Sequence, residues 1–139
     1  MTEMIQFPFS ATERSAGFSF PYLPLILTCQ ENSLSVSGLL DTGATVNVLP
    51  YSMGRRLGAV WDEHTTSVQL TGNLARSEAR SLVVSATVAE FEPIRMAFAW
   101  TQADNIPLIL GQVNFFMEFD VCFFRSQSVF EIRPRDDNN

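Results

Sequence analysis

Short apolar runs separated by turn-forming residues are the feature that most constrains the fold of this chain. A run such as YLPLIL at residues 22–27 is long enough for a strand, but it is far shorter than the roughly 20 apolar residues that a membrane-spanning helix needs. Runs of this kind, bounded by Gly, Pro, Asn, Asp or Ser, are typical of strands. The pattern predicts strands at residues 18–30, 33–40, 65–70, 80–88, 93–100, 107–110, 119–124 and 128–133. We therefore expect an all-β fold made of short strands.

Two short helices complete the predicted pattern. One helix is expected at residues 50–57, because a proline suits the first helical turn and Gly58 follows the end. The other is expected at residues 112–119, directly after Gly111. Hairpin turns are predicted at residues 31–33 and 125–127. One face of the strand at 93–100 is predicted to carry Ile94, Met96, Phe98 and Trp100.

Chain length and charge limit the classes of function. With 139 residues, of which 46% are hydrophobic, the chain is large enough to bury a core. We expect one domain over residues 1–139, with a frayed tail at about 134–139. The net charge of −6 argues against nucleic acid and against an anionic membrane as partners.

The cysteines and the histidine indicate no metal site and no cofactor. Cys29 and Cys122 lie far apart in the sequence, and His64 is the only histidine. Neither a metal-ligand spacing nor a Ser-His arrangement is therefore indicated. The N-terminal segment lacks the basic region and the long apolar run of a secretory signal. Two isolated cysteines fit a reducing compartment, and we expect a cytoplasmic protein.

One carboxylate interrupts the apolar segment GLLDTGATVNVLP at residues 38–50. Burying an ionised carboxylate is costly unless it is paired or hydrogen-bonded, so the position of Asp41 needs a reason. Gly43 permits backbone conformations that turn N–H groups toward the carboxylate, and the hydroxyl of Thr42 can bond to the backbone. Asp-Thr-Gly by itself is more often an ordinary turn at the end of a strand.

A second apolar segment, NIPLILGQVNFF, occupies residues 105–116. It reads as a buried strand that ends at Gly111 and leads into a helix, which alone is a common pattern. Together, LLDTGA with VLP after it and LILG before a helix resemble the retropepsin-like aspartic protease family, in order and spacing, over about residues 23–132. The resemblance implies closed, barrel-like β-sheets with one or two short helices, and an active site at the two-fold axis of a homodimer.

The resemblance also implies a role for the residues of both segments. Asp41 would be the catalytic aspartate, and its partner would be the Asp41 of a second copy. The residues that would support this site are Thr42, Gly43, Ala44, Leu110 and Gly111. Thr42 would bond across the two-fold axis, the two residues after it would let the substrate backbone approach, and Leu110 and Gly111 would pack behind the loop.

The segment between the two motifs corresponds to the flap that closes over the substrate in this family. Its tip would comprise Gly72, Asn73, Leu74, Ala75 and Arg76. Many viral members have a glycine-rich tip, whereas here Gly72 is the only glycine of these five residues. The mobility of the viral flap and its hydrogen bonds to substrate therefore do not carry over directly.

Aspartic proteolysis needs two carboxylates that share one proton around a water molecule. The chain has one Asp-Thr-Gly, and the other aspartates lack that context: Asp62, Asp104, Asp120, Asp136 and Asp137. A two-lobed enzyme would need a much longer chain, whereas a two-fold dimer brings each residue near its own copy. We therefore predict an aspartic endopeptidase that acts as a homodimer on peptide or protein substrates.

Two departures from the viral pattern are coupled. Viral members often carry an acidic residue after Asp-Thr-Gly-Ala and an arginine after the apolar-Gly motif, where this chain has Thr45 and Gln112. Both charges are missing together, so no buried charge is left unpaired. We hypothesise a neutral hydrogen bond between Thr45 and Gln112. Because the chain begins at Met1, we expect a stand-alone protein rather than a piece of a polyprotein.

Two other interpretations fit parts of the sequence. The segment DTGAT looks like the phosphate-binding turn of sugar kinases and actin-like ATPases, but those folds need far more chain and a second phosphate loop. A retropepsin-like dimer that binds peptides or acts as a scaffold without catalysis is the stronger alternative. Trp61, Trp100 and the twelve Phe residues are expected in the core rather than in the site.

Overall fold

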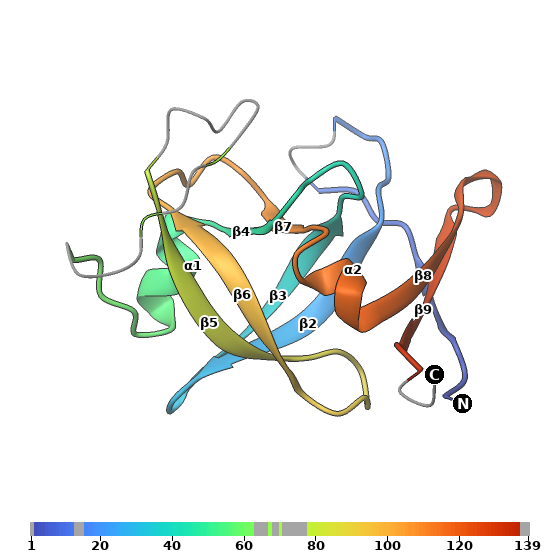
Figure 1. The fold of residues 1–139 in the computed structure, drawn as a ribbon. Helices are drawn as coiled ribbons and strands as arrows, with labels where there is room; N and C mark the ends of the chain where they lie inside the picture. Colours follow the sequence, from blue (N-terminus) through green and yellow to red (C-terminus); the bar gives the residue numbers. More distant parts are fainter. Residues whose placement is uncertain (1, 13–15, 63–66, 68–69, 71–77, 137–139) are drawn as a thin grey trace.

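The computed structural model describes residues 2–12, 16–62, 67, 70 and 78–136, and this part of the chain is mostly β-structure (Figure 1). Its elements are, in order, β1 (Ile5–Pro8), β2 (Tyr22–Cys29), β3 (Asn32–Leu40), β4 (Asn47–Leu49), α1 (Tyr51–Arg56), β5 (Ala79–Thr87), β6 (Ile94–Thr101), β7 (Leu108–Leu110), α2 (Phe115–Glu118), β8 (Phe119–Phe124), η3 (Arg125–Gln127) and β9 (Val129–Pro134). The predicted all-β class with short helices is confirmed.

Six of the strands close into a barrel in the order β2-β3-β7-β4-β6-β5. The hairpin of β2 and β3 places Cys29 opposite Asn32, and the antiparallel pair of β5 and β6 places Ala79 opposite Thr101. β2 also pairs with β5, and this contact closes the barrel. The short strands β7 and β4 are inserted between the two hairpins, with β7 parallel to β3 and β4 parallel to β6. Closure removes the open edges that a flat sheet would expose.

The other three strands form a separate sheet in the order β1-β9-β8, drawn at the right of the barrel in Figure 1, near both termini. β9 is central, β8 pairs with it as a hairpin, and β1 pairs with its other edge, with Ile5 opposite Ile132. The hairpin predicted around residues 125–127 is thereby confirmed. Phe130 and Ile132 of β9 are fully buried in the same core cluster as the barrel residues, so this sheet packs on the barrel.

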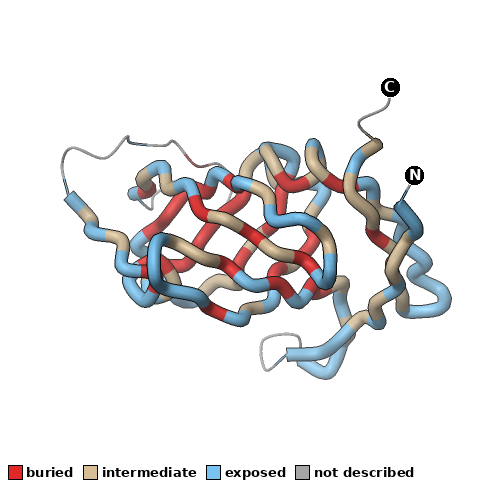
Figure 2. The backbone as a smooth tube through the Cα atoms, turned by 90° about the horizontal axis from the view of Figure 1, so that it is seen from below, coloured by how far each residue is buried: buried red, intermediate tan, exposed pale blue. Residues whose placement is uncertain are grey.

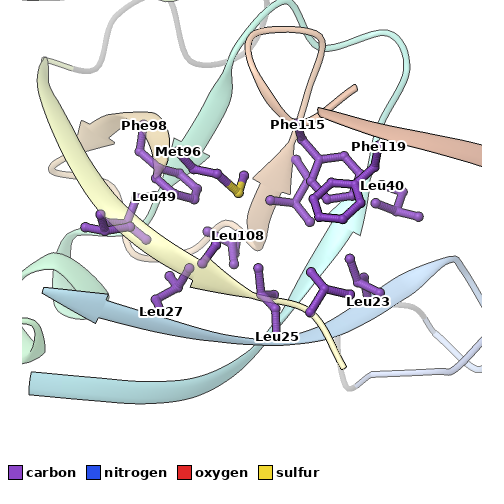
Figure 3. Packing of buried hydrophobic residues seen from close by; sticks show 14 of the residues in the cluster. Leu23, Leu25, Leu27, Leu40, Leu49, Met96, Phe98, Leu108, Phe115 and Phe119 are labelled. Carbon is purple, nitrogen blue, oxygen red and sulfur yellow. The ribbon is translucent and has the colours of Figure 1, made fainter. Parts of the chain in front are cut away.

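The buried side chains of the barrel strands form a large hydrophobic cluster and a smaller one, which contains Val48, Leu70, Ala79 and Ala99. Along β6, Met96, Phe98 and Trp100 are buried whereas Arg95 and Ala97 are exposed, as the alternating pattern predicted. Figure 2 shows buried and exposed positions alternating along the barrel strands. Figure 3 shows the leucines of β2 facing the side chains of β6. Phe115 of α2 and Phe119 of β8 lie at one end of the cluster. Burying each such side chain contributes about 1.5–3 kcal/mol.

The aromatic residues expected in the core lie there only in part: Trp100 is buried, whereas the prediction is wrong for four exposed phenylalanines, Phe18, Phe20, Phe123 and Phe124. Trp100 is buried, stacks on Tyr51 with ring centroids 5.6 Å apart, and meets Trp61 edge-on at 5.2 Å. The indole Nε1 of Trp100 donates a hydrogen bond to the Tyr51 carbonyl (3.1 Å). The indole also lies against Gly54, the buried residue of α1, where a Cβ atom would overlap it. This cluster ties α1 to the barrel.

Several predicted boundaries differ from the structure. The strand expected at 18–30 begins at Tyr22, and the helix expected at 112–119 is reduced to α2. The helix begins late because Val113 forms a parallel bridge with Val46, which holds that part of the chain extended. β1 and β4 were not predicted, because they are only four and three residues long and pair with strands distant in sequence.

Parts of two predictions lie outside the described residues. Of the strand expected at 65–70, Ser67 and Leu70 are described; Ser67 forms an antiparallel bridge with Arg80, and Leu70 is buried. Of the tail expected at about 134–139, the described part includes the last residue of β9, and the N–H of Arg135 donates to the Glu118 carbonyl (2.9 Å).

Candidate active site

Parallel pairing of β3 with β7 brings the two sequence motifs together. Leu40, the last residue of β3, lies in register with Leu110, the last residue of β7. Because parallel strands that end in register finish at the same edge of a sheet, the next residues, Asp41 and Gly111, lie side by side. The N–H of Asp41 donates to the Leu110 carbonyl (3.0 Å), so the backbone of the aspartate is anchored to the neighbouring strand.

The turn after Asp41 orients its carboxylate. The N–H of Gly43 donates to Asp41 Oδ1 (3.0 Å), and the N–H of Ala44 donates to the Asp41 carbonyl (3.1 Å). A Cβ atom on Gly43 would lie 3.3 Å from Oδ1, so a larger residue would crowd the carboxylate. Asp41 is half-buried, whereas Thr42 and Gly43 at the tip of the turn are exposed. The carboxylate is therefore held in one orientation at the rim of the barrel.

A ladder of backbone hydrogen bonds joins the active-site loop, residues 41–47, to the support segment, residues 110–113. The first bond is the one from Asp41 to Leu110. Three more bonds run from Gln112 N to Ala44 O (2.9 Å), from Val113 N to Thr45 O (3.0 Å) and from Asn47 N to Val113 O (2.9 Å). The loop is thus paired along most of its length, and its position depends on where the support segment lies.

Two glycines allow the segments to approach this closely. A Cβ atom on Gly111 would lie 2.5 Å from the Val46 carbonyl oxygen and 2.8 Å from that of Ala44. A Cβ atom on Gly38 of β3 would lie 2.7 Å from Leu110 Cδ1. Leu110 is fully buried behind the loop. Leu110 and Gly111 therefore lie directly behind the loop, and their part in catalysis stays a prediction.

The hydrogen bond hypothesised between Thr45 and Gln112 is wrong. The Gln112 side chain instead donates from Nε2 to the Thr42 carbonyl (2.9 Å). The Thr45 carbonyl accepts the N–H of Val113 and the Ala44 carbonyl accepts the N–H of Gln112, while the Gln112 side chain extends back along the loop to Thr42. Gln112 thus holds the tip of the turn that follows the aspartate.

Sequence reasoning missed two asparagines beside this loop. Asn47 is fully buried, and its Oδ1 accepts the N–H of Gly111 (2.8 Å). Its Nδ2 donates to the Ala97 carbonyl (3.0 Å) and to Asn114 Oδ1 (3.2 Å). The available signal was an asparagine inside the apolar run VNVLP, since a polar residue in a buried strand is kept there by hydrogen bonds.

The other predicted features can be placed only in part. The flap-tip residues Gly72, Asn73, Leu74, Ala75 and Arg76 lie outside the described residues. Cys29 and Cys122 are both free. Within the described ranges, no group of three or more His, Cys, Asp or Glu side chains could hold a metal ion. The same ranges contain no helix that is both long enough and apolar enough to cross a membrane.

Comparison with known proteins identifies the family to which the chain belongs. The family model described as aspartyl protease matches residues 27–113, which include both motifs. A retropepsin-like aspartic protease from Rickettsia conorii is similar in structure, with 15% identity, a TM-score of 0.62, and coverage of 94% of this chain and 91% of that one. The EIAV protease in complex with the inhibitor HBY-793 is 23% identical, with a TM-score of 0.49 and coverage of 67% and 82%. No curated protein sequence matches. The chain belongs to the aspartyl protease family, and its fold is the retropepsin-like one.

Proposed function

We propose that this protein is an aspartic endopeptidase that acts as a homodimer and hydrolyses peptide bonds with a water molecule activated between two Asp41 carboxylates. The observation that carries the proposal is the placement of Asp41 at the barrel rim. Its Oδ1 is held by the Gly43 N–H, and the described residues make no other hydrogen bond to the carboxylate. Membership of the aspartyl protease family supports the same chemistry.

The chemistry requires the two carboxylates to share one proton. The ionised Asp41 takes a proton from the water, and the water oxygen forms a bond to the peptide carbonyl carbon. The protonated Asp41 of the other copy gives its proton to the carbonyl oxygen. The first Asp41 then gives the proton that it took from the water to the amide nitrogen as the C–N bond breaks. The second Asp41 takes a proton from a hydroxyl of the intermediate as the C=O bond forms, so the pair again holds a single proton. Two carboxylates in contact repel each other when both are ionised, and this repulsion retains the shared proton.

Two surface features support assembly of a second copy. The tip of the active-site turn, Thr42 and Gly43, is exposed in the single chain. β8 is an edge strand of the three-stranded sheet, and it carries Phe123 and Phe124 at 39% and 38% exposure. An exposed apolar edge strand is a template for pairing with another chain.

A peptide-cleavage assay with matched variants tests the proposal. The wild type is incubated with a diverse peptide library at several pH values, and the cleavage products are sequenced. Asp41→Asn should abolish cleavage and leave the fold intact, because the amide has nearly the same shape but cannot act as a base. The matched control is Asp104→Asn: Asp104 Oδ1 also accepts a backbone N–H, from Ser52 at 2.8 Å, and an amide oxygen can replace it. Asp104→Asn should therefore cleave normally.

The outcomes of this assay distinguish an aspartic protease from a non-catalytic dimer that binds peptides. Full activity in Asp41→Asn would contradict aspartic proteolysis. A wild type that binds peptides without cutting any of them would instead favour a non-catalytic, peptide-binding dimer.

A further inference from the structure

Asn47 is the buried polar side chain that joins the support segment to the barrel. It begins β4, is 0% exposed, and uses its side-chain amide in three hydrogen bonds. The oxygen accepts from Gly111, and the nitrogen donates to Ala97 and Asn114. Because Asn47 is fully buried, truncating this side chain would leave its buried polar partners unpaired.

The partners of Asn47 leave one orientation of the amide. Oδ1 faces the N–H of Gly111, which can only donate, and Nδ2 faces the carbonyl of Ala97, which can only accept. Exchanging the two ends would place donor against donor and acceptor against acceptor. The position of the Gly111 N–H is therefore specified by a rigid group on β4.

Asn114 extends the same network to β6. Its Oδ1 accepts from Asn47 Nδ2 and from the Ala97 N–H (3.1 Å), and its Nδ2 donates to the Arg95 carbonyl (3.2 Å). The Asn114 amide thus bonds to the backbone of β6 at two points. The network connects the support segment to two strands of the closed barrel rather than to another loop.

We propose that Asn47 is a positioning residue that holds the Asp41 carboxylate in its reactive place by fixing the Gly111 N–H. The inference rests on the proposed function. The path has two steps: Asn47 Oδ1 fixes Gly111, and the adjacent Leu110 carbonyl accepts the N–H of Asp41. Because Asp41 must meet the carboxylate of the second copy, a small displacement of the support segment misplaces the reacting pair, and misplacement slows the chemical step.

Thr101 provides a comparison within the same barrel. It is also 0% exposed, and its Oγ1 accepts the N–H of Ala103 (3.2 Å). Thr101 ends β6 and has no hydrogen bond to the active-site loop or the support segment among those of the described residues. Replacing Thr101 therefore removes a buried polar contact without touching the path to Asp41.

The test compares Asn47→Leu with Thr101→Val in kcat and KM on one peptide that the wild type cleaves. Asn47→Leu should lower kcat at least about tenfold with KM within about twofold, as expected when positioning of the reacting groups is lost. Thr101→Val should lower the melting temperature and leave kcat within about twofold. Hydrogen exchange measured by mass spectrometry on peptides spanning residues 41–47 and 110–113 should be faster in Asn47→Leu than in both other proteins.

The other possible results of this experiment also decide whether Asn47 is a positioning residue. A folded Asn47→Leu with unchanged kcat and unchanged exchange would overturn the proposal. If the wild type cleaves no peptide, the proposed function fails, and the exchange measurement alone then decides the inference. If Asn47→Leu does not fold, Asn47→Thr, which keeps one side-chain oxygen and suits a strand, takes its place with the same expected direction. If neither variant folds while Thr101→Val does, Asn47 serves the fold rather than the site, and the proposal is wrong.

Discussion

At the scale of single residues, we expect Ala44 to influence the proton that the proposed pair of Asp41 carboxylates shares. It is half-buried, follows the Asp-Thr-Gly turn, and its N–H is bonded to the Asp41 carbonyl. A hydroxyl at this position would offer a donor to the ionised carboxylate pair, and a donor to the charged form favours loss of the shared proton. Ala44→Ser should therefore move the alkaline limb of the pH–rate profile toward lower pH.

The measurement is the rate of cleavage of one peptide at saturating concentration across pH, for wild type and Ala44→Ser. Ala11→Ser, which makes the same change at an exposed residue, serves as the control and should leave the profile in place. An unchanged limb in Ala44→Ser would mean that position 44 does not reach the carboxylates.

Gly54 gives a stability prediction at the same scale. A Cβ atom there would overlap the Trp100 indole, which is buried and stacked on Tyr51. Gly54→Ala should lower the free energy of unfolding by about 1–3 kcal/mol through overpacking, although alanine favours the helix by about 1 kcal/mol. Urea denaturation measures the change. Arg56→Ala, at an exposed position of the same helix, should change the free energy of unfolding by no more than about 0.5 kcal/mol. An undiminished free energy of unfolding in Gly54→Ala would mean that α1 can move away from the indole.

At the scale of elements, β8 is the strand that we expect to meet the second copy. Its end carries two exposed phenylalanines, and its outer edge is unpaired within the described part of the chain. Replacing Phe123 and Phe124 together by Asp should raise the dimer dissociation constant at least about tenfold, because charge would replace apolar contact at the interface. Sedimentation across a dilution series measures it.

The control for β8 is Val60→Asp, which puts one aspartate on a loop residue that is 69% exposed. Circular dichroism should show that all three proteins keep their β-structure. A dimer of undiminished strength in the double variant would place the interface elsewhere.

At the scale of the whole molecule, an active site built from two copies can be inactivated by one defective copy. Adding an excess of Asp41→Asn to a fixed amount of wild type should suppress cleavage nearly completely, because most wild-type chains then form mixed dimers with one competent carboxylate. The same excess of Asp41→Asn carrying aspartate at positions 123 and 124 should suppress far less. Undiminished cleavage in the first mixture would mean that one chain holds a complete site.

The pH dependence also belongs to the assembled molecule. Activity should rise and then fall with pH, since a single shared proton is lost when both carboxylates ionise and a second proton is gained at low pH. The profile should be centred on the acidic side of neutrality. A rate that stays flat or rises up to pH 9 would contradict the two-carboxylate mechanism.

Local sequence patterns predicted many of the strands and turns of this protein and its family, because these features depend on residues that are close together in the sequence. Alternation along residues 93–100 predicts the buried face of β6, and the turn signals around 125–127 predict the hairpin of β8 and β9. Asp-Thr-Gly and the apolar-Gly motif identify the family, since the residues that hold a carboxylate in a turn are contiguous: the Gly43 N–H reaches an aspartate only two positions away.

Tertiary structure decided what depends on partners distant in sequence. β4 has only three residues and forms because the barrel supplies β6 and β7 on either side. The second helix is shortened because Val113 pairs with Val46 of the active-site loop instead of continuing a helical turn. The bond from Gln112 to Thr42 and the three bonds of Asn47 join groups up to 70 positions apart, and no local pattern encodes them. The sequence by itself determined which residue carries the carboxylate and that its loop follows a strand. Pairing of strands distant in sequence decided what holds that loop, because the parallel pairing of β3 with β7 brings residues 41–47 against 110–113.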